Sequence, residues 1–171
     1  AFLVWAPGAN NPAPGYLDYM KYFSAHDIGV LIMDIRGNGG VTEGYPMDIE
    51  RDAGLFLKGE WPQWYLITGD MIAARQYLQA GYPHLPVYAA GDSNGGRYAA
   101  LAAGSDHDFA GYLGVSTSGF HHMGDQYASP LKEFLLSIDP EIQVQEIIPR
   151  QVILFHAPDD PVIPFKEGEA L

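Results

Sequence analysis

The stretch Val87-Tyr88-Ala89-Ala90-Gly91-Asp92-Ser93-Asn94-Gly95-Gly96 carries the pattern Gly-x-Ser-x-Gly between two segments of different character. The four residues before it predict a short buried strand, and the mostly small residues 98–103 after it predict a helix. A serine placed between a strand and a helix indicates a sharp turn that exposes its hydroxyl. We therefore interpret Ser93 as a nucleophile and expect it to have a positive φ angle.

Small neighbours are needed where a strand turns so sharply into a helix. Gly91 and Gly95 meet this demand, and Gly96 would let the helix approach the strand closely. One alternative is a glycine-rich loop that contains a serine by chance. Another is an anion-binding turn in an unrelated doubly wound α/β protein. The second alternative is the weaker one, because the turn has neither the lysine of a phosphate loop nor the spacing of a dinucleotide fingerprint.

The composition predicts one globular domain over residues 1–171, with 47% hydrophobic and 18% charged residues. A formal net charge of −12 argues against nucleic acid and against anionic membrane surfaces as partners. No apolar run approaches the roughly 20 residues that span a bilayer. Because the chain has no cysteine, it can form no disulfide, thiolate nucleophile or cysteine-based metal site, and we expect no cofactor.

Strand-like and helix-like segments alternate along the chain, which predicts an α/β fold with a mostly parallel, doubly wound sheet. The continuous apolar run Val30–Met33 is typical of a strand buried on both faces. The other expected strands are Phe2–Ala6, Val87–Ala90, Tyr112–Val115 and Val152–Phe155. The other expected helices are Tyr16–Ser24, Asp48–Leu57, Tyr65–Gln79, Leu131–Ser137 and Phe165–Leu171.

Four segments resemble the α/β-hydrolase superfamily in the order that the superfamily has them. They are Ala6–Ala9, Asp34–Gly40, the turn at Ser93, and His156–Pro164. The sequence of Asp34–Gly40 is also similar to that of acetyl-xylan esterases and cephalosporin-C deacetylases. Serine peptidases of the prolyl-oligopeptidase type share much of the same pattern. The resemblance implies a hydrolase core that covers the superfamily's third to seventh strands, with residues 117–148 as a short cap segment.

The resemblance also implies a chemistry for these positions. Ser93 would attack the carbonyl of a small-molecule carboxylic ester and form an acyl-enzyme. The backbone N–H groups of Ala9 and Asn94 would hold the oxyanion. Asp160, rather than Asp159, matches the position of the acid that orients a histidine. A serine peptidase of the same fold and a non-catalytic binding or scaffold module remain as alternatives.

The general base is the missing member, because the superfamily places its histidine after the acid and no histidine follows Asp160. We therefore expect a fragment, cut at both ends, that could self-associate through exposed sheet edges. His121 and His122 are candidate substitute bases, although such residues are more often surface or lid residues. A metal site formed by these two with Asp125 is a weak alternative, since adjacent histidines rarely point the same way, and we expect no metal.

Overall fold

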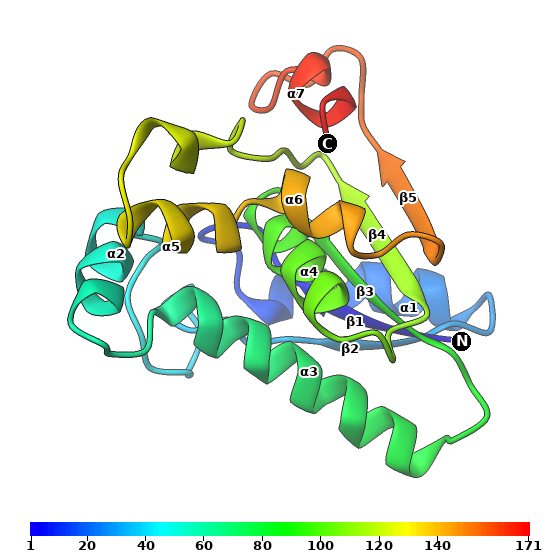
Figure 1. Ribbon diagram of the computed structural model, residues 1–171. Coiled ribbons are helices and arrows are strands. Elements are labelled where there is room, and N and C mark those ends of the chain that lie inside the picture. Colours follow the sequence, from blue (N-terminus) through cyan, green and yellow to red (C-terminus); the bar gives the residue numbers. More distant parts are fainter.

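The computed structural model describes residues 1–171 as a five-stranded, all-parallel sheet with the strand order β2-β1-β3-β4-β5 (Figure 1). The strands are β1 (Phe2–Ala6), β2 (Gly29–Ile32), β3 (Val87–Asp92), β4 (Gly111–Val115) and β5 (Gln151–Phe155). The α-helices are α1 (Leu17–Ser24), α2 (Ile49–Leu57), α3 (Gln63–Gly81), α4 (Asn94–Ser105), α5 (Leu131–Ser137), α6 (Pro140–Gln145) and α7 (Phe165–Glu169). Two short 3₁₀ helices are η1 (Ala13–Tyr16) and η2 (Met123–Gln126). The predicted α/β class and parallel sheet are confirmed.

Most of the core lies on one face of the sheet. It contains 23 buried residues, and α3, α4 and α6 cover this face (Figure 1). Four alanines of α4, at positions 99, 100, 102 and 103, are fully buried. Their small side chains let α4 lie close against β3, and only Ser93 separates the end of the strand from the start of the helix.

The opposite face of the sheet is covered mainly by α1 and holds only four buried residues. Trp5 and Leu3 point to this face, while Val4 and Ala6 of the same strand point to the main core, as the two-residue period of a strand requires. At the β5 edge this face is open, and the Phe155 side chain is 61% exposed.

The expectation that Val30–Met33 is a strand buried on both faces is wrong. The strand β2 covers Gly29–Ile32, so Met33 lies outside it, and all four residues of the strand are only half-buried. The reason is that β2 pairs with β1 on one side and forms the edge of the sheet on the other. A continuous apolar run therefore did not distinguish an edge strand from a central one.

The expected helices are confirmed, with some differences at their ends. The helix α2 begins after Asp48, whose side chain accepts a hydrogen bond from the Arg51 N–H and so caps the helix. The helix α6 was not predicted; its six residues begin at Pro140 and are capped by Asp139. Residues 117–148 contribute Phe134, Ile138 and other apolar side chains to the main core, so this segment packs with the sheet.

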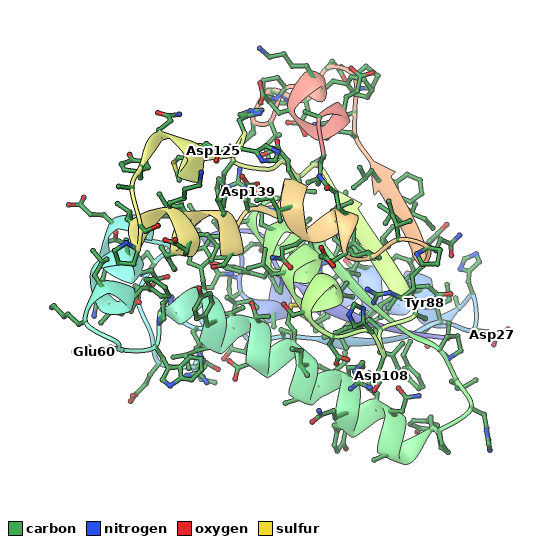
Figure 2. The ribbon with its side chains drawn as sticks, in the orientation of Figure 1. Asp27, Glu60, Tyr88, Asp108, Asp125 and Asp139 are labelled. Atoms are coloured by element: carbon green, nitrogen blue, oxygen red, sulfur yellow. The ribbon has the colours of Figure 1, made fainter.

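Exposed acidic residues are spread over the surface of the molecule. Asp27, Glu60, Asp108 and Asp125 are exposed and lie at separate places around the molecule, whereas Asp139 is buried near the start of α6 (Figure 2). None of the helices combines the length and apolar character that crossing a membrane requires.

Candidate active site

The backbone at Ser93 has the geometry that the sequence pattern predicts. Ser93 lies between the end of β3 at Asp92 and the start of α4 at Asn94, with φ of 50° and ψ of −123°. Its N–H donates to the Val115 carbonyl at 2.9 Å, so the neighbouring strand β4 holds the turn. A positive φ at a non-glycine residue is costly and needs such support.

The glycines around Ser93 are required by close backbone approaches. A side chain on Gly95 would collide with the backbone carbonyls of Ala6 and Pro7, and one on Gly91 would meet the backbone of Gly95. A Cβ on Gly96 would lie 2.7 Å from Thr117. The turn is therefore packed against the end of β1 and against the chain that follows β4, as the sequence predicts.

The Ser93 side chain lies at the border of a cavity of about 680 Å³ and makes no hydrogen bond to another group of the chain. The walls are largely aromatic and belong to the sheet face that α1 covers. The aromatic residues are Trp5, Tyr16, Tyr19, Tyr22, Phe23 and Phe155. The sequence analysis missed them, although three of them recur at the spacing of one helix face (Tyr16, Tyr19 and Phe23).

The two predicted oxyanion donors share a second, smaller cavity. Ala9 and Asn94 both line a space of about 210 Å³ on the other side of the elbow, together with Pro7. Neither the Ala9 N–H nor the Asn94 N–H has a hydrogen-bond partner within the chain. The two unpaired backbone donors thus belong to residues of one cavity, and Ser93, which borders the other cavity, directly precedes Asn94 in the chain.

The loop that carries Ala9 is fixed by Asn38, which the sequence analysis did not single out. The Asn38 amide Nδ2 donates to the Gly8 carbonyl at 2.9 Å, and Asn38 Oδ1 accepts from the Asn10 N–H at 2.7 Å. The Asn11 N–H donates to the Gly8 carbonyl. As a result, the Ala9 N–H has no hydrogen-bond partner, whereas the N–H groups of Gly8 and Asn10 on either side of it both donate hydrogen bonds. Asn38 belongs to the Asp34–Gly40 segment, and the resemblance of that segment to a known motif was the one sequence feature that could have pointed to this residue.

Asp160 lies in the loop after β5, at the same edge of the sheet as Ser93. Strand β4 separates β5 from β3, so the two loops are two strands apart. Asp160 Oδ1 accepts from the N–H groups of Val162 at 2.9 Å and Ile163 at 3.0 Å. The pKa of Asp160 lies below its ordinary value because the Ile163 and Val162 amides donate to the carboxylate. The group is therefore suited to remain ionised, as a triad acid must.

The histidine closest to this acid is engaged elsewhere. His156 Nε2 lies 3.6 Å from Asp160 Oδ2, but it also contacts the Ile163 carbonyl oxygen at 2.7 Å. Only a protonated Nε2 can make that contact, since a carbonyl oxygen accepts and does not donate. The His156 ring packs edge-on against Phe165, so the residue joins the acid loop to α7.

His121 and His122, the candidate substitute bases, contact carboxylates of other elements. His121 lies 3.3 Å from Glu141 and 2.5 Å from Glu167, and His122 lies 3.5 Å from Glu141. None of the six histidines lines either cavity beside the elbow. Asp125 is paired with Lys132 at 2.9 Å, and no group of three or more metal-ligating side chains is arranged to hold an ion.

Comparison with known proteins places this geometry in a family. The family model described as "Serine aminopeptidase, S33" matches residues 1–154. The chain is similar in structure to TT1662 from Thermus thermophilus, with a TM-score of 0.73, 18% identity, and coverage of 99% of this chain and 71% of that one. No curated protein sequence matches the chain.

Two further structures carry enzyme names. A puromycin-hydrolyzing peptidase of Mycobacterium tuberculosis has a TM-score of 0.68 and 19% identity, with coverage of 99% of this chain and 27% of that chain. An acetyl xylan esterase from Paenibacillus sp. R4 has a TM-score of 0.64 and 19% identity, with coverage of 85% of this chain and 55% of that chain. At these identities the likeness shows a common fold, and the chain spans between about a quarter and about seven tenths of the lengths of these three structures.

Proposed function

The chain belongs to the serine aminopeptidase family of α/β hydrolases, and we propose that within it Ser93 is the nucleophile for cleavage of a carboxylic ester. The observation that carries the proposal is the positive φ of Ser93 at the turn between β3 and α4, supported by the unpaired N–H groups of Ala9 and Asn94, two residues that line one cavity beside this turn. Such donors are useful to a group that develops negative charge beside the nucleophile.

The chemistry follows from these positions. The Ser93 hydroxyl attacks the acyl carbon, its proton passes to a base, and the carbonyl oxygen becomes an anion held by Ala9 and Asn94. Collapse of this intermediate breaks the bond to the alcohol, which leaves with a proton, and water then releases the acid from Ser93. Asp160 would orient the imidazole that acts as the base and would stabilise its protonated form.

An ester suits this site better than an amide does. Expulsion of an amine requires that a general acid protonate the leaving nitrogen, whereas an alcohol or phenol of lower pKa can leave with less assistance. The residues that line the two cavities include Ser93 and the candidate oxyanion donors, and no histidine is among them. Peptide cleavage is the second candidate, and the family description and the peptidase among the structural neighbours favour it.

The test is a comparison of the chain with its Ser93→Ala variant on p-nitrophenyl acetate and on an aminoacyl p-nitroanilide, each with and without added imidazole. We expect hydrolysis of the ester that depends on Ser93 and increases with imidazole beyond the rate of imidazole alone. Faster Ser93-dependent cleavage of the anilide would favour the peptidase. Equal rates for the two proteins under every condition would instead support a non-catalytic binding or scaffold module.

A further inference from the structure

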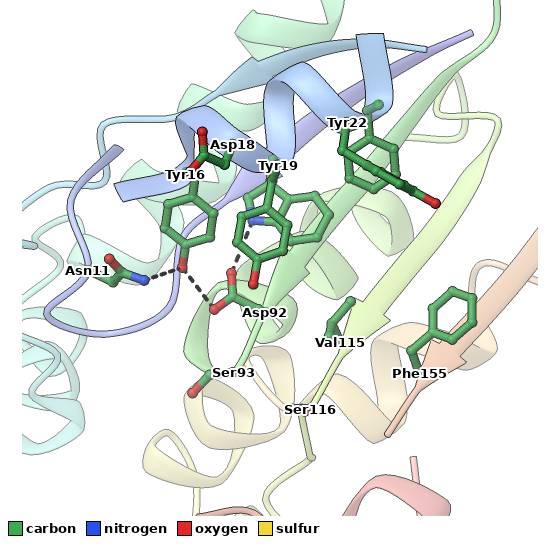
Figure 3. A pocket seen from close by; sticks show the side chains of 12 residues that line it. Asn11, Tyr16, Asp18, Tyr19, Tyr22, Asp92, Ser93, Val115, Ser116 and Phe155 are labelled. Carbon is green, nitrogen blue, oxygen red and sulfur yellow. Dashed lines mark hydrogen bonds between the residues drawn. The ribbon is translucent and has the colours of Figure 1, made fainter. Parts of the chain in front are cut away.

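The hydroxyl of Tyr16 joins the oxyanion loop to the elbow (Figure 3). It donates to Asp92 Oδ2 at 2.9 Å and accepts from the Gly8 N–H and from Asn11 Nδ2, both at 3.0 Å. A tyrosine hydroxyl has one donor and two acceptor positions, so this group is fully used. Tyr16 is only 3% exposed, which means that water cannot easily replace any of these partners.

Asp92, the residue just before Ser93, is the second member of this network. Its Oδ1 accepts from Trp5 Nε1 at 3.0 Å, while its Oδ2 accepts from Tyr16. Both partners are donors, which fits an ionised carboxylate. Burial raises the pKa of Asp92, and the hydrogen bonds from Tyr16 and Trp5 act in the opposite direction. These bonds are therefore what keeps a charged group tolerable at this depth.

The oxyanion loop passes close to this carboxylate. A Cβ on Gly8 would lie 2.7 Å from Asp92 Oδ2 and 3.3 Å from the Ser93 Cβ, so a side chain at position 8 would displace the Asp92 carboxylate or the loop. The Gly8 N–H donates to the Tyr16 hydroxyl, which in turn donates to Asp92, the residue before Ser93. The Tyr16 side chain thus fixes the distance between Asp92, next to Ser93, and Gly8, next to Ala9.

We propose that Tyr16 and Asp92 are positioning residues that set the Ala9 N–H at its distance from Ser93. The inference rests on the proposed function, since it gives Ala9 the role of oxyanion donor. Neither residue is a proton carrier in this account. Tyr16 acts through the Gly8 amide, and Asp92 acts through Tyr16 by fixing the direction of its hydroxyl.

The test begins with Tyr16→Phe, which keeps the ring that packs against Trp5 and Tyr19 and removes only the hydroxyl. Tyr77→Phe is the control, because this tyrosine is 74% exposed and lies on α3. Amide hydrogen exchange by NMR follows the loop directly. We expect exchange at Gly8 to be about tenfold faster or more in Tyr16→Phe and unchanged in Tyr77→Phe, because only the former removes the amide's partner.

Kinetics then connect the loop to the reaction. We expect kcat for Ser93-dependent ester hydrolysis to fall roughly 10- to 100-fold in Tyr16→Phe with little change in KM, since a displaced oxyanion donor weakens binding of the transition state and not of the substrate. Asp92→Asn should give the same pattern, and the double variant should be no worse than the stronger single variant, because both act through one hydroxyl.

Each outcome separates this inference from the proposed function. Unchanged Gly8 exchange in both Tyr16→Phe and Asp92→Asn would overturn the inference, whatever the activity. Faster Gly8 exchange with an unchanged kcat would also overturn it, because the loop would then move without consequence for the reaction. If the unaltered chain shows no Ser93-dependent hydrolysis, the result would count against the proposed function and therefore also against the role given to Ala9.

Discussion

The elbow and the acid loop lie at the same edge of the sheet, yet they are fixed in different ways. The elbow is held by distant partners: Trp5 and Tyr16 bind Asp92, and β4 binds the Ser93 amide. The acid loop is held by its own backbone, since Asp160 accepts from residues two and three positions further on. Its neighbour Val162 is 80% exposed. The core thus determines the position of Ser93, whereas the position of Asp160 depends on the turn that follows it and on the contact of His156 with Ile163.

The largest effect that this comparison predicts is on chemistry at the acid loop, with little effect on stability. In Asp160→Asn the amide oxygen can still accept from Val162 and Ile163, so the free energy of unfolding should change little. When imidazole is supplied as the base, loss of the charge that orients it should lower Ser93-dependent hydrolysis by roughly tenfold or more. Steady-state kinetics and thermal unfolding of the same sample measure both. Activity similar to that of the unaltered chain would remove Asp160 from the proposed site.

The elbow should show a large effect on stability. Gly95→Ala places a methyl group against the backbone carbonyls of Ala6 and Pro7, which cannot move without displacing β1. We expect a loss of about 3 kcal/mol in the free energy of unfolding, as for overpacking of a tight core. Gly54→Ala is the matched control, because a Cβ there meets nothing within 4 Å in the interior of α2. This control should be neutral or slightly stabilising, and equal losses in both variants would contradict the close packing of the elbow.

The two regions should respond to pH in opposite directions. Burial raises the pKa of Asp92, so its native form holds a proton more tightly, and its contribution to stability falls as pH rises from the ordinary aspartate pKa through the raised one. The pKa of Asp160 is lowered, so its contribution is present above the ordinary value and is lost as pH falls through the lowered one.

Urea unfolding at a series of acidic pH values, with Asp92→Asn and Asp160→Asn beside the unaltered chain, separates the two contributions. As pH rises, the free energy of unfolding of the unaltered chain should fall relative to that of Asp92→Asn. Over the same pH series, it should rise relative to that of Asp160→Asn. Slopes of the same sign for both variants would show that the environments of the two carboxylates do not differ in this way.

The smallest effects are expected at the exposed histidines. His121 and His122 are 60% and 47% exposed, so their contacts with Glu141 and Glu167 should contribute less than about 1 kcal/mol each. We expect His121→Gln and His122→Gln to leave Ser93-dependent hydrolysis within about twofold of the unaltered chain, as surface substitutions usually do. A large loss of hydrolysis in either variant, with stability preserved, would identify that histidine as the general base.

Sequence predicts the elbow well because its requirements are local. A strand, small glycines and a helix are all encoded within the residues around Ser93, and the positive φ follows from them. The Tyr16–Asp92 contact joins residues 76 positions apart, and no short pattern encodes it. The prediction for β2 was wrong for a similar reason, because a run of apolar residues does not determine whether a strand pairs with one other strand or with two.

The aromatic walls of the cavity beside Ser93 could not be predicted from the sequence either. An aromatic residue is not by itself a sign of a cavity wall, since Trp64 is fully buried against Tyr98 and Phe120 in the main core. The aromatic walls beside Ser93 come instead from β1, α1 and β5. Three segments that are separate in sequence meet there only because the parallel strand order places their ends at one edge.

Covalent capture of the acyl group tests the central claim, that Ser93 is a nucleophile beside a formed oxyanion site. The chain would be mixed with p-nitrophenyl acetate, quenched in acid, and analysed by intact-mass and peptide mass spectrometry, with Ser93→Ala as the control. We predict one acetyl group on the peptide that contains Ser93 and none on the corresponding peptide of the variant. Acetylation confined to lysines or the N-terminus, equal in both proteins, would contradict the account.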